Sequence, residues 1–166
     1  MKIGLLFIAG ITLGYIVKIV VNWLKIDDYT MSKKNFFFEA VGAIMVTWSA
    51  VNLGIEEAII FSIIALTLAG ISVIDFHTFE IPLIFIIVGV VTLIAGILLK
   101  VIFLSAAFWG IFVGALIPLA IMLILWTITK RQGMGYGDIQ LGIVLGAWLG
   151  PMRMALTLFG ASLLSL

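Results

Sequence analysis

The chain has 166 residues, of which 64% are hydrophobic and only 10% are charged, and its formal net charge is +1. Soluble domains carry about 25% charged residues, so this chain lacks the polar side chains needed to cover its surface in water. The composition therefore predicts a single domain over residues 1–166 that lies in a lipid bilayer. Without a basic patch, nucleic acid is not an expected partner, and the absence of cysteine excludes disulfides and thiolate zinc sites.

The first half of the chain contains three long apolar segments. A membrane-spanning helix needs about 20 mostly apolar residues. The predicted spans are residues 3–21, about 36–53 and about 58–74. Lys2 precedes the first segment as it would in a signal peptide, but no small-x-small cleavage site follows. We therefore interpret the first segment as a retained span.

A short polar loop at 75–80 separates these segments from a fourth span. That span opens at Ile81-Pro82, where proline suits the first helical turn, and it ends near Lys100. The apolar run 101–129 follows. It contains Pro118, so we expect a tilted or kinked span there.

The C-terminal part begins with the loop 130–138. A short apolar piece then leads to Gly150-Pro151, and a final apolar stretch runs to Leu166. Because the chain ends inside an apolar run, the sequence leaves open whether its C-terminus is truncated. Together, these segments predict an all-α, polytopic transmembrane helix bundle of about six spans.

The distribution of basic residues predicts which loops face the cytoplasm. Alternate loops of a polytopic protein share a side, which groups the loops at 25–35, 75–80 and 130–138. That side holds Lys25, Lys33, Lys34, Lys130 and Arg131, whereas the opposite side holds Lys2, Lys100 and Arg153. The positive-inside rule therefore places the first group in the cytoplasm. The same parity predicts that Asp75 and Asp138 lie on one face of the membrane.

Glycines recur at a spacing of four in three apolar segments. They are Gly10 and Gly14, then Gly110 and Gly114, and finally Gly142, Gly146 and Gly150. Small residues at this spacing let helix backbones approach closely in lipid. We therefore expect these glycines to lie at helix–helix contacts.

Most acidic residues have a simple explanation in the sequence. Those in polar turns are expected to be solvated: Asp27, Asp28, Glu56 and Glu57. Glu39 lies near the start of a span, where it could cap the helix or pair with Lys33 or Lys34.

Asp75 and Asp138 differ, because each lies at the junction between a loop and a strongly apolar segment. Two close carboxylates share a proton, since both cannot easily ionise. Such a pair activates water with its ionised member and polarises a carbonyl with its protonated member. A structural alternative is that each aspartate caps a helix N-terminus.

The residues Gly135-Tyr136-Gly137-Asp138 match the G-x-G-D motif of the intramembrane aspartyl proteases. The longer string GMGYGDIQLGIVLGAWLG resembles the second active-site motif of the bacterial type IV prepilin peptidases, and ISVIDFHTFEIP resembles the first. The opening span and the segment around Glu39 are weaker matches. The resemblance touches most of the chain and is most specific at 135–138 combined with 74–82.

The resemblance implies an aspartic endopeptidase of the bacterial inner membrane, with Asp75 and Asp138 as its catalytic pair and no cofactor. It implies a prepilin-like precursor as partner, with a basic leader followed by an apolar helix, cleaved on the cytoplasmic side after a glycine. The sidedness derived from the basic residues agrees with that. Gly135 and Gly137 would let the substrate backbone approach Asp138 closely.

Three features depart from the family pattern. Gln140 stands where relatives often have lysine, and Leu83 stands where a polar or acidic residue often follows Ile-Pro. A short linker replaces the cysteine-containing cytoplasmic insert that most relatives carry after the first span. That insert accompanies N-methylation of the new amino terminus, so methylation by this chain is left open.

Two alternatives would give the protein a transport function instead. The letters GYGD also occur in potassium-channel filters, but Gly133-Met134 replace the usual Thr-Val, and basic residues precede the loop. A transporter or proton relay could use the same carboxylates, although the sequence shows no repeated halves. Ion conductance or substrate flux in reconstituted bilayers would favour these alternatives.

A metal site is a further alternative, built from Asp75, His77 and Glu80. These residue types bind zinc or iron. The chain has one histidine and no H-E-x-x-H motif, so we expect no metal and place His77 near the substrate instead.

Overall fold

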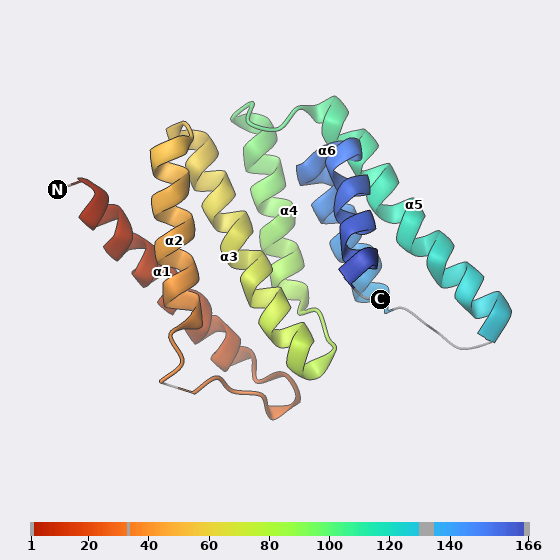
Figure 1. Cartoon of the computed structure of the whole chain (residues 1–166), viewed down its shortest axis with the longest axis horizontal. Helices are drawn as coiled ribbons and strands as arrows, with labels where there is room; N and C mark the ends of the chain where they lie inside the picture. The colour runs from red at the N-terminus through yellow and green to blue at the C-terminus, as the bar shows by residue number, and fades with distance from the viewer. Residues whose placement is uncertain (1, 33, 130–134, 165–166) are drawn as a thin grey trace. The chain divides into compact units, whose positions relative to one another are not determined.

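The computed structural model describes residues 2–32, 34–129 and 135–164. Within them the chain forms only helices: α1 (Lys2–Leu24), the 3₁₀ helix η1 (Ile26–Asp28), α2 (Phe37–Asn52), α3 (Ile55–Thr78), α4 (Leu83–Leu98), α5 (Leu104–Thr129) and α6 (Tyr136–Leu164). Figure 1 shows their arrangement along the chain. The all-helical prediction is confirmed.

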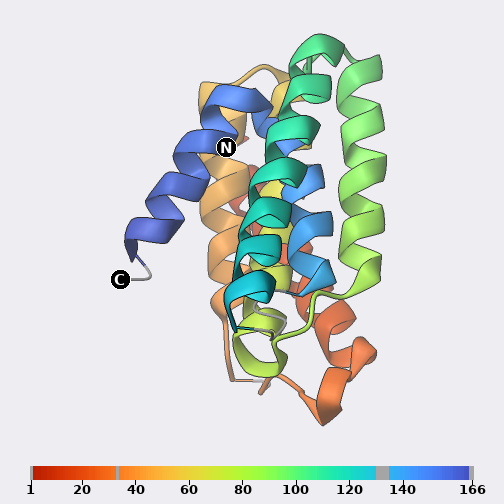
Figure 2. The same cartoon turned by 90° about the vertical axis from the view of Figure 1, so that its right-hand side faces the viewer.

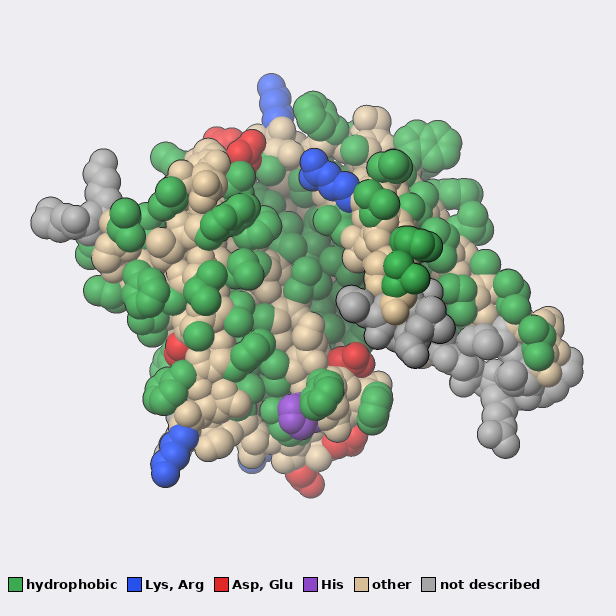
Figure 3. Space-filling model, viewed as in Figure 1, with side chains coloured by type: hydrophobic (Ala, Val, Ile, Leu, Met, Phe, Trp, Pro, Cys, Tyr) green, Lys and Arg blue, Asp and Glu red, His purple; other side chains and the backbone are tan. Residues whose placement is uncertain are grey.

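Among the described residues, four helices are long and apolar enough to cross a membrane, namely α1, α3, α5 and α6. The other two, α2 and α4, have 16 residues each. At 1.5 Å per residue, 16 residues rise about 24 Å, less than the roughly 30 Å of a bilayer core. Hydrophobic side chains spread over the face shown in Figure 3, as expected for a surface that lies in lipid. The protein is therefore a polytopic helical membrane protein.

The chain divides into two compact units, Met1–Gly96 and Ile97–Leu166, and each is described by itself. The organisation of the whole chain as one domain stays a prediction. In the first unit, α1 contacts both α2 and α3, and α2 also contacts α3. A Cβ atom at Gly10 or Gly14 would collide with backbone of α2. The close helix approach predicted for this pair is therefore confirmed.

Polar side chains also join the helices of the first unit. Lys18 of α1 forms an ion pair with Glu39 of α2, with Nζ and Oε1 3.0 Å apart, and both residues are buried. The sequence had offered Lys34, or Lys33 outside the described residues, as the partner of Glu39. Lys18 takes that place because α1 packs directly against α2. Deeper in the unit, the hydroxyls of Ser49 on α2 and Ser62 on α3 lie 2.9 Å apart.

In the second unit, α5 packs against α6 through glycines. A Cβ atom at Gly110 would overlap the carbonyl oxygen of Gly146, and one at Gly114 would overlap that of Gly142. The predicted contact between these two glycine series is therefore confirmed. Helix α5 continues through Pro118 as a single helix.

Helix α6 is interrupted at Gly150, whose φ of 73° and ψ of 171° lie outside the helical region. Such backbone angles are essentially restricted to glycine, and the following Pro151 disfavours helical angles at the residue before it. The two parts of α6 run in different directions on either side of this break (Figure 2). The predicted division at Gly150-Pro151 is confirmed.

Candidate active site

Asp75 lies in the last turn of α3, and its side chain is half-buried. The sequence had predicted a loop at 75–80, but the helix continues to Thr78. Two side chains bond to helix carbonyls in this turn: His77 Nδ1 lies 2.8 Å from the Val73 oxygen, and the Thr78 hydroxyl lies 3.0 Å from that of Ile74. The helix ends where Phe79 adopts left-handed angles and donates its N–H to the Asp75 carbonyl.

The position of Asp75 contradicts the helix-capping alternative for this residue. The C-terminal end of a helix carries partial negative charge, so a carboxylate in the last turn is unfavourable. Capping by a carboxylate requires the opposite end of a helix. Local helix energetics therefore do not account for an aspartate at this position.

Asp138 lies in the first turn of α6. Its Oδ2 accepts a hydrogen bond from the Gly135 N–H at 3.1 Å, and its own N–H donates to the Gly135 carbonyl at 3.2 Å. This reciprocal arrangement resembles a capping box, in which backbone groups at a helix start are satisfied. The capping interpretation thus holds for Asp138. A carboxylate that caps a helix still has a second oxygen for chemistry.

Gly135 and Gly137 frame the start of α6. Gly135 is exposed and directly precedes the helix, whereas Gly137 is half-buried within the first turn. A Cβ at Gly135 would lie 3.6 Å from Asp138 Oδ2, an ordinary contact distance. Their role in positioning a substrate stays a prediction. The residues before them in the motif, Gly133 and Met134, lie outside the described residues.

The two aspartates belong to different units, Asp75 to Met1–Gly96 and Asp138 to Ile97–Leu166. Their meeting at one site therefore stays a prediction. The predicted cytoplasmic side of the loops also stays a prediction. Three of the basic residues on which it rests, Lys33, Lys130 and Arg131, lie outside the described residues. The metal alternative is not supported: within the part of the chain that the structure describes, no three histidine or acidic side chains gather to hold an ion.

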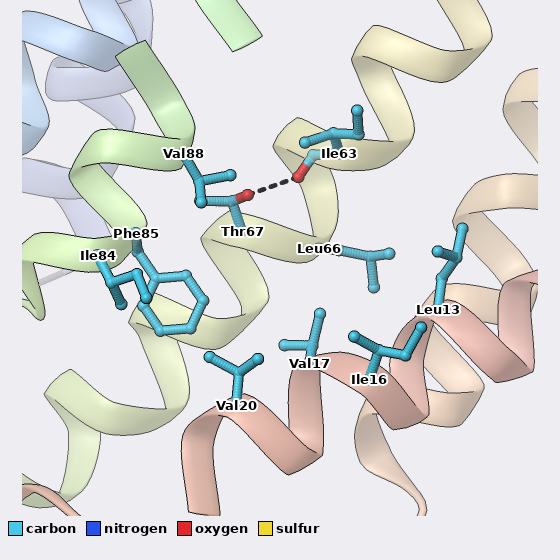
Figure 4. A pocket seen from close by; sticks show the side chains of 10 residues that line it. All are labelled: Leu13, Ile16, Val17, Val20, Ile63, Leu66, Thr67, Ile84, Phe85 and Val88. Carbon is cyan, nitrogen blue, oxygen red and sulfur yellow. Dashed lines mark hydrogen bonds between the residues drawn. The ribbon is translucent and has the colours of Figure 1, made fainter. Parts of the chain in front are cut away.

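An apolar cavity of about 250 Å³ lies between α1, α3 and α4 (Figure 4). Val17 of α1, Leu66 of α3 and Phe85 of α4 are among its lining residues. The one hydroxyl in the lining, that of Thr67, donates to the Ile63 carbonyl at 2.7 Å. Without a titratable side chain, this cavity offers no acid–base chemistry.

One neighbour of the Asp75 turn was not foreseen from the sequence. Tyr29, in the connection between α1 and α2, stacks on His77, with ring centroids 4.2 Å apart and planes 28° from parallel. Burial raises the pKa of Tyr29 above its usual value of 10.0. The sequence shows a tyrosine within a polar linker, but nothing in it indicates that His77 is the ring against which Tyr29 stacks.

Comparison with known proteins gives two matches. The sequence model of the type IV leader peptidase family matches residues 59–166, a segment that includes both Asp75 and Asp138. A curated relative from Stutzerimonas stutzeri, a prepilin leader peptidase/N-methyltransferase, is 39% identical over 59 residues. That match covers 36% of this chain and 20% of the relative, so it spans about a fifth of the relative's length. No solved structure matches the chain.

Proposed function

Because the chain belongs to the type IV leader peptidase family, we propose that it is an aspartic endopeptidase in which Asp75 and Asp138 form the catalytic pair. The observation that carries this proposal is the placement of Asp75. A half-buried carboxylate occupies the last turn of an apolar helix, where the helix dipole opposes it. Ionisable side chains kept at such a cost in a membrane protein usually serve function.

The proposed reaction is hydrolysis of a peptide bond by an activated water. The ionised aspartate of the pair accepts a proton from water as its oxygen attacks the scissile carbonyl carbon. The protonated aspartate donates a hydrogen bond to the carbonyl oxygen. When the C–N bond breaks, the proton taken from water passes from the first aspartate to the leaving amine. The two carboxyls titrate as a coupled pair, so the roles belong to the pair rather than to one fixed residue.

The proposed substrate is a prepilin-like precursor with a basic leader, cut on the cytoplasmic side of the bacterial inner membrane. The excess of lysine and arginine in the loops grouped with Asp75 and Asp138 supports this sidedness. A basic leader is held at the cytoplasmic face by the same charge effect. Gly135 and Gly137 would pass close to the substrate backbone beside Asp138.

Co-expression of the chain with a candidate precursor tests the proposal. We expect Asp75→Asn and Asp138→Asn each to slow leader removal by at least about 100-fold, because asparagine cannot cycle a proton. Asn at 138 keeps an oxygen that can accept the Gly135 N–H, so the start of α6 is retained. Glu56→Gln is the matched control, since Glu56 is exposed in the first turn of α3, at the opposite end of that helix from Asp75.

Processing at the wild-type rate by both variants would exclude the aspartate pair. The unfolding temperature of each variant in detergent shows whether a loss of activity is a loss of fold. If the wild type and an asparagine variant unfold at the same temperature but only the wild type is active, the substituted aspartate acts in catalysis.

A further inference from the structure

The connection between α1 and α2 lies against the last turn of α3, the turn that carries Asp75. The 3₁₀ helix η1 contacts α3, and Tyr29 directly follows η1. Figure 1 shows this connection, in orange, beside the yellow-green end of α3. The contact lies wholly within the first unit. It joins residues 48 positions apart through the stacked rings of Tyr29 and His77.

The backbone of this connection is held in an unusual conformation. Lys25, Asp27 and Asp28 all have positive φ, at 44°, 47° and 59°. Such angles are uncommon for residues other than glycine and persist where surrounding contacts enforce them. The connection is anchored on α1, because the N–H of Met31 donates to Asn22 Oδ1 at 2.6 Å. The linker thus presents Tyr29 to α3 in a fixed position.

The partner ring is also held in place. Because the Val73 carbonyl can only accept, His77 Nδ1 carries the proton of their 2.8 Å hydrogen bond. This bond fixes the orientation of the imidazole on the helix surface. The linker therefore orients the ring of Tyr29, helix α3 orients the ring of His77, and the stack joins the two.

We propose that the Tyr29–His77 stack is a positioning device for Asp75. Terminal turns of helices fray easily, and opening of this one would break the bond from the Phe79 N–H to the Asp75 carbonyl. The stack ties that turn to the anchored linker and so keeps the Asp75 carboxyl in its working orientation. This inference rests on the proposed function of Asp75, and it assigns Tyr29 and His77 a role without contact to the substrate.

The size of the effect follows from the strength of aromatic pairing. An aromatic pair favours the joined state by about two- to tenfold. A tyrosine phenol is neutral at physiological pH, and burial raises the pKa of Tyr29 further, so the ring lies against His77 without a charge of its own. Loss of the stack should thus lower the ratio of closed to open turn by about two- to tenfold.

The test uses the full chain in lipid nanodiscs and compares Tyr29→Leu with Tyr29→Phe. We expect Tyr29→Leu to lower kcat for leader removal by up to about tenfold with KM unchanged, and Tyr29→Phe to retain the wild-type kcat because it keeps the ring. Trp23→Leu is the matched control for loss of an aromatic side chain, because Trp23 is 73% exposed at the end of α1.

A second measurement separates this inference from the proposed function. Hydrogen exchange of the Phe79 amide reports the last turn of α3 directly and needs no enzymatic activity. It should accelerate about two- to tenfold in Tyr29→Leu but not in Tyr29→Phe or Trp23→Leu. If Tyr29→Leu does not accumulate, His77→Leu breaks the same stack from the other side.

Three results would overturn the inference: unchanged exchange at Phe79 in Tyr29→Leu and His77→Leu, equal exchange in Tyr29→Phe and Tyr29→Leu, or an unchanged kcat in an active Tyr29→Leu enzyme. An inactive wild-type chain with accelerated exchange in Tyr29→Leu would instead count against the peptidase proposal alone.

Discussion

The helices of the two units meet through different chemistry. In Met1–Gly96, an ion pair joins α1 to α2 and a pair of serine hydroxyls joins α2 to α3, in addition to close glycine contacts. In Ile97–Leu166, the described contact between α5 and α6 rests on the glycines of one helix against the backbone of the other. Side-chain bonds described there are local, such as Thr157 to the Arg153 carbonyl.

This difference has a physical reason and a consequence. Lipid tails are as apolar as leucine, so helices in a membrane associate through close packing and polar contacts rather than through the hydrophobic effect. An interface with a buried ion pair is sensitive to the loss of one charge. An interface of backbone on backbone is sensitive to added volume. We therefore expect the loss of one charge to destabilise the first unit and added volume to destabilise the second.

The largest effect is expected from breaking the ion pair of the first unit. Glu39→Leu leaves Lys18, which is 4% exposed, as a buried charge without its carboxylate. We expect a loss of about 3–5 kcal/mol in the free energy of unfolding, measured in mixed micelles. The double variant Lys18→Met/Glu39→Leu removes both charges and should regain most of that loss. A double variant no more stable than Glu39→Leu would contradict this account.

A smaller but still large effect is expected from adding volume to the second unit. Gly146→Leu places a side chain where the Gly110 carbonyl lies, so α5 and α6 must separate. Overpacking of this kind should cost about 3 kcal/mol of unfolding free energy. Gly160→Leu is the matched control on the same helix, because a Cβ at Gly160 meets nothing within 4 Å. Equal stability of the two variants would show that the glycine contact is unimportant.

The smallest effect is expected from the serine pair of the first unit. Ser49→Ala removes a hydroxyl that is 0% exposed and lies 2.9 Å from that of Ser62. Interhelical hydrogen bonds in membrane proteins contribute on average about 0.6 kcal/mol, because other partners are available in the unfolded state. We expect a loss of that size, and no additional loss in Ser49→Ala/Ser62→Ala. Independent, additive losses would mean that the two hydroxyls do not act as a pair.

Much of the molecule could be predicted from local sequence. The apolar segments, the glycine spacing and the break at Gly150-Pro151 each express a property of consecutive residues, so the structure confirms them. The family follows from the motifs around Asp75 and Asp138, which lie within the matched segment. The predicted loop after Ile74 was wrong, although the residues there are polar. The helix continues because the side chains of His77 and Thr78 bond to carbonyls of its own last turns.

The sequence by itself determined that this is a helical membrane protein, that α6 breaks at Gly150, and which carboxylates are candidates for chemistry. These features depend on hydropathy, backbone sterics and short motifs, which are local. Only the tertiary structure decided that Glu39 pairs with Lys18 and that Tyr29 stacks on His77. Those choices join residues far apart along the chain, and they depend on which helix faces pack together rather than on which residues are neighbours in sequence.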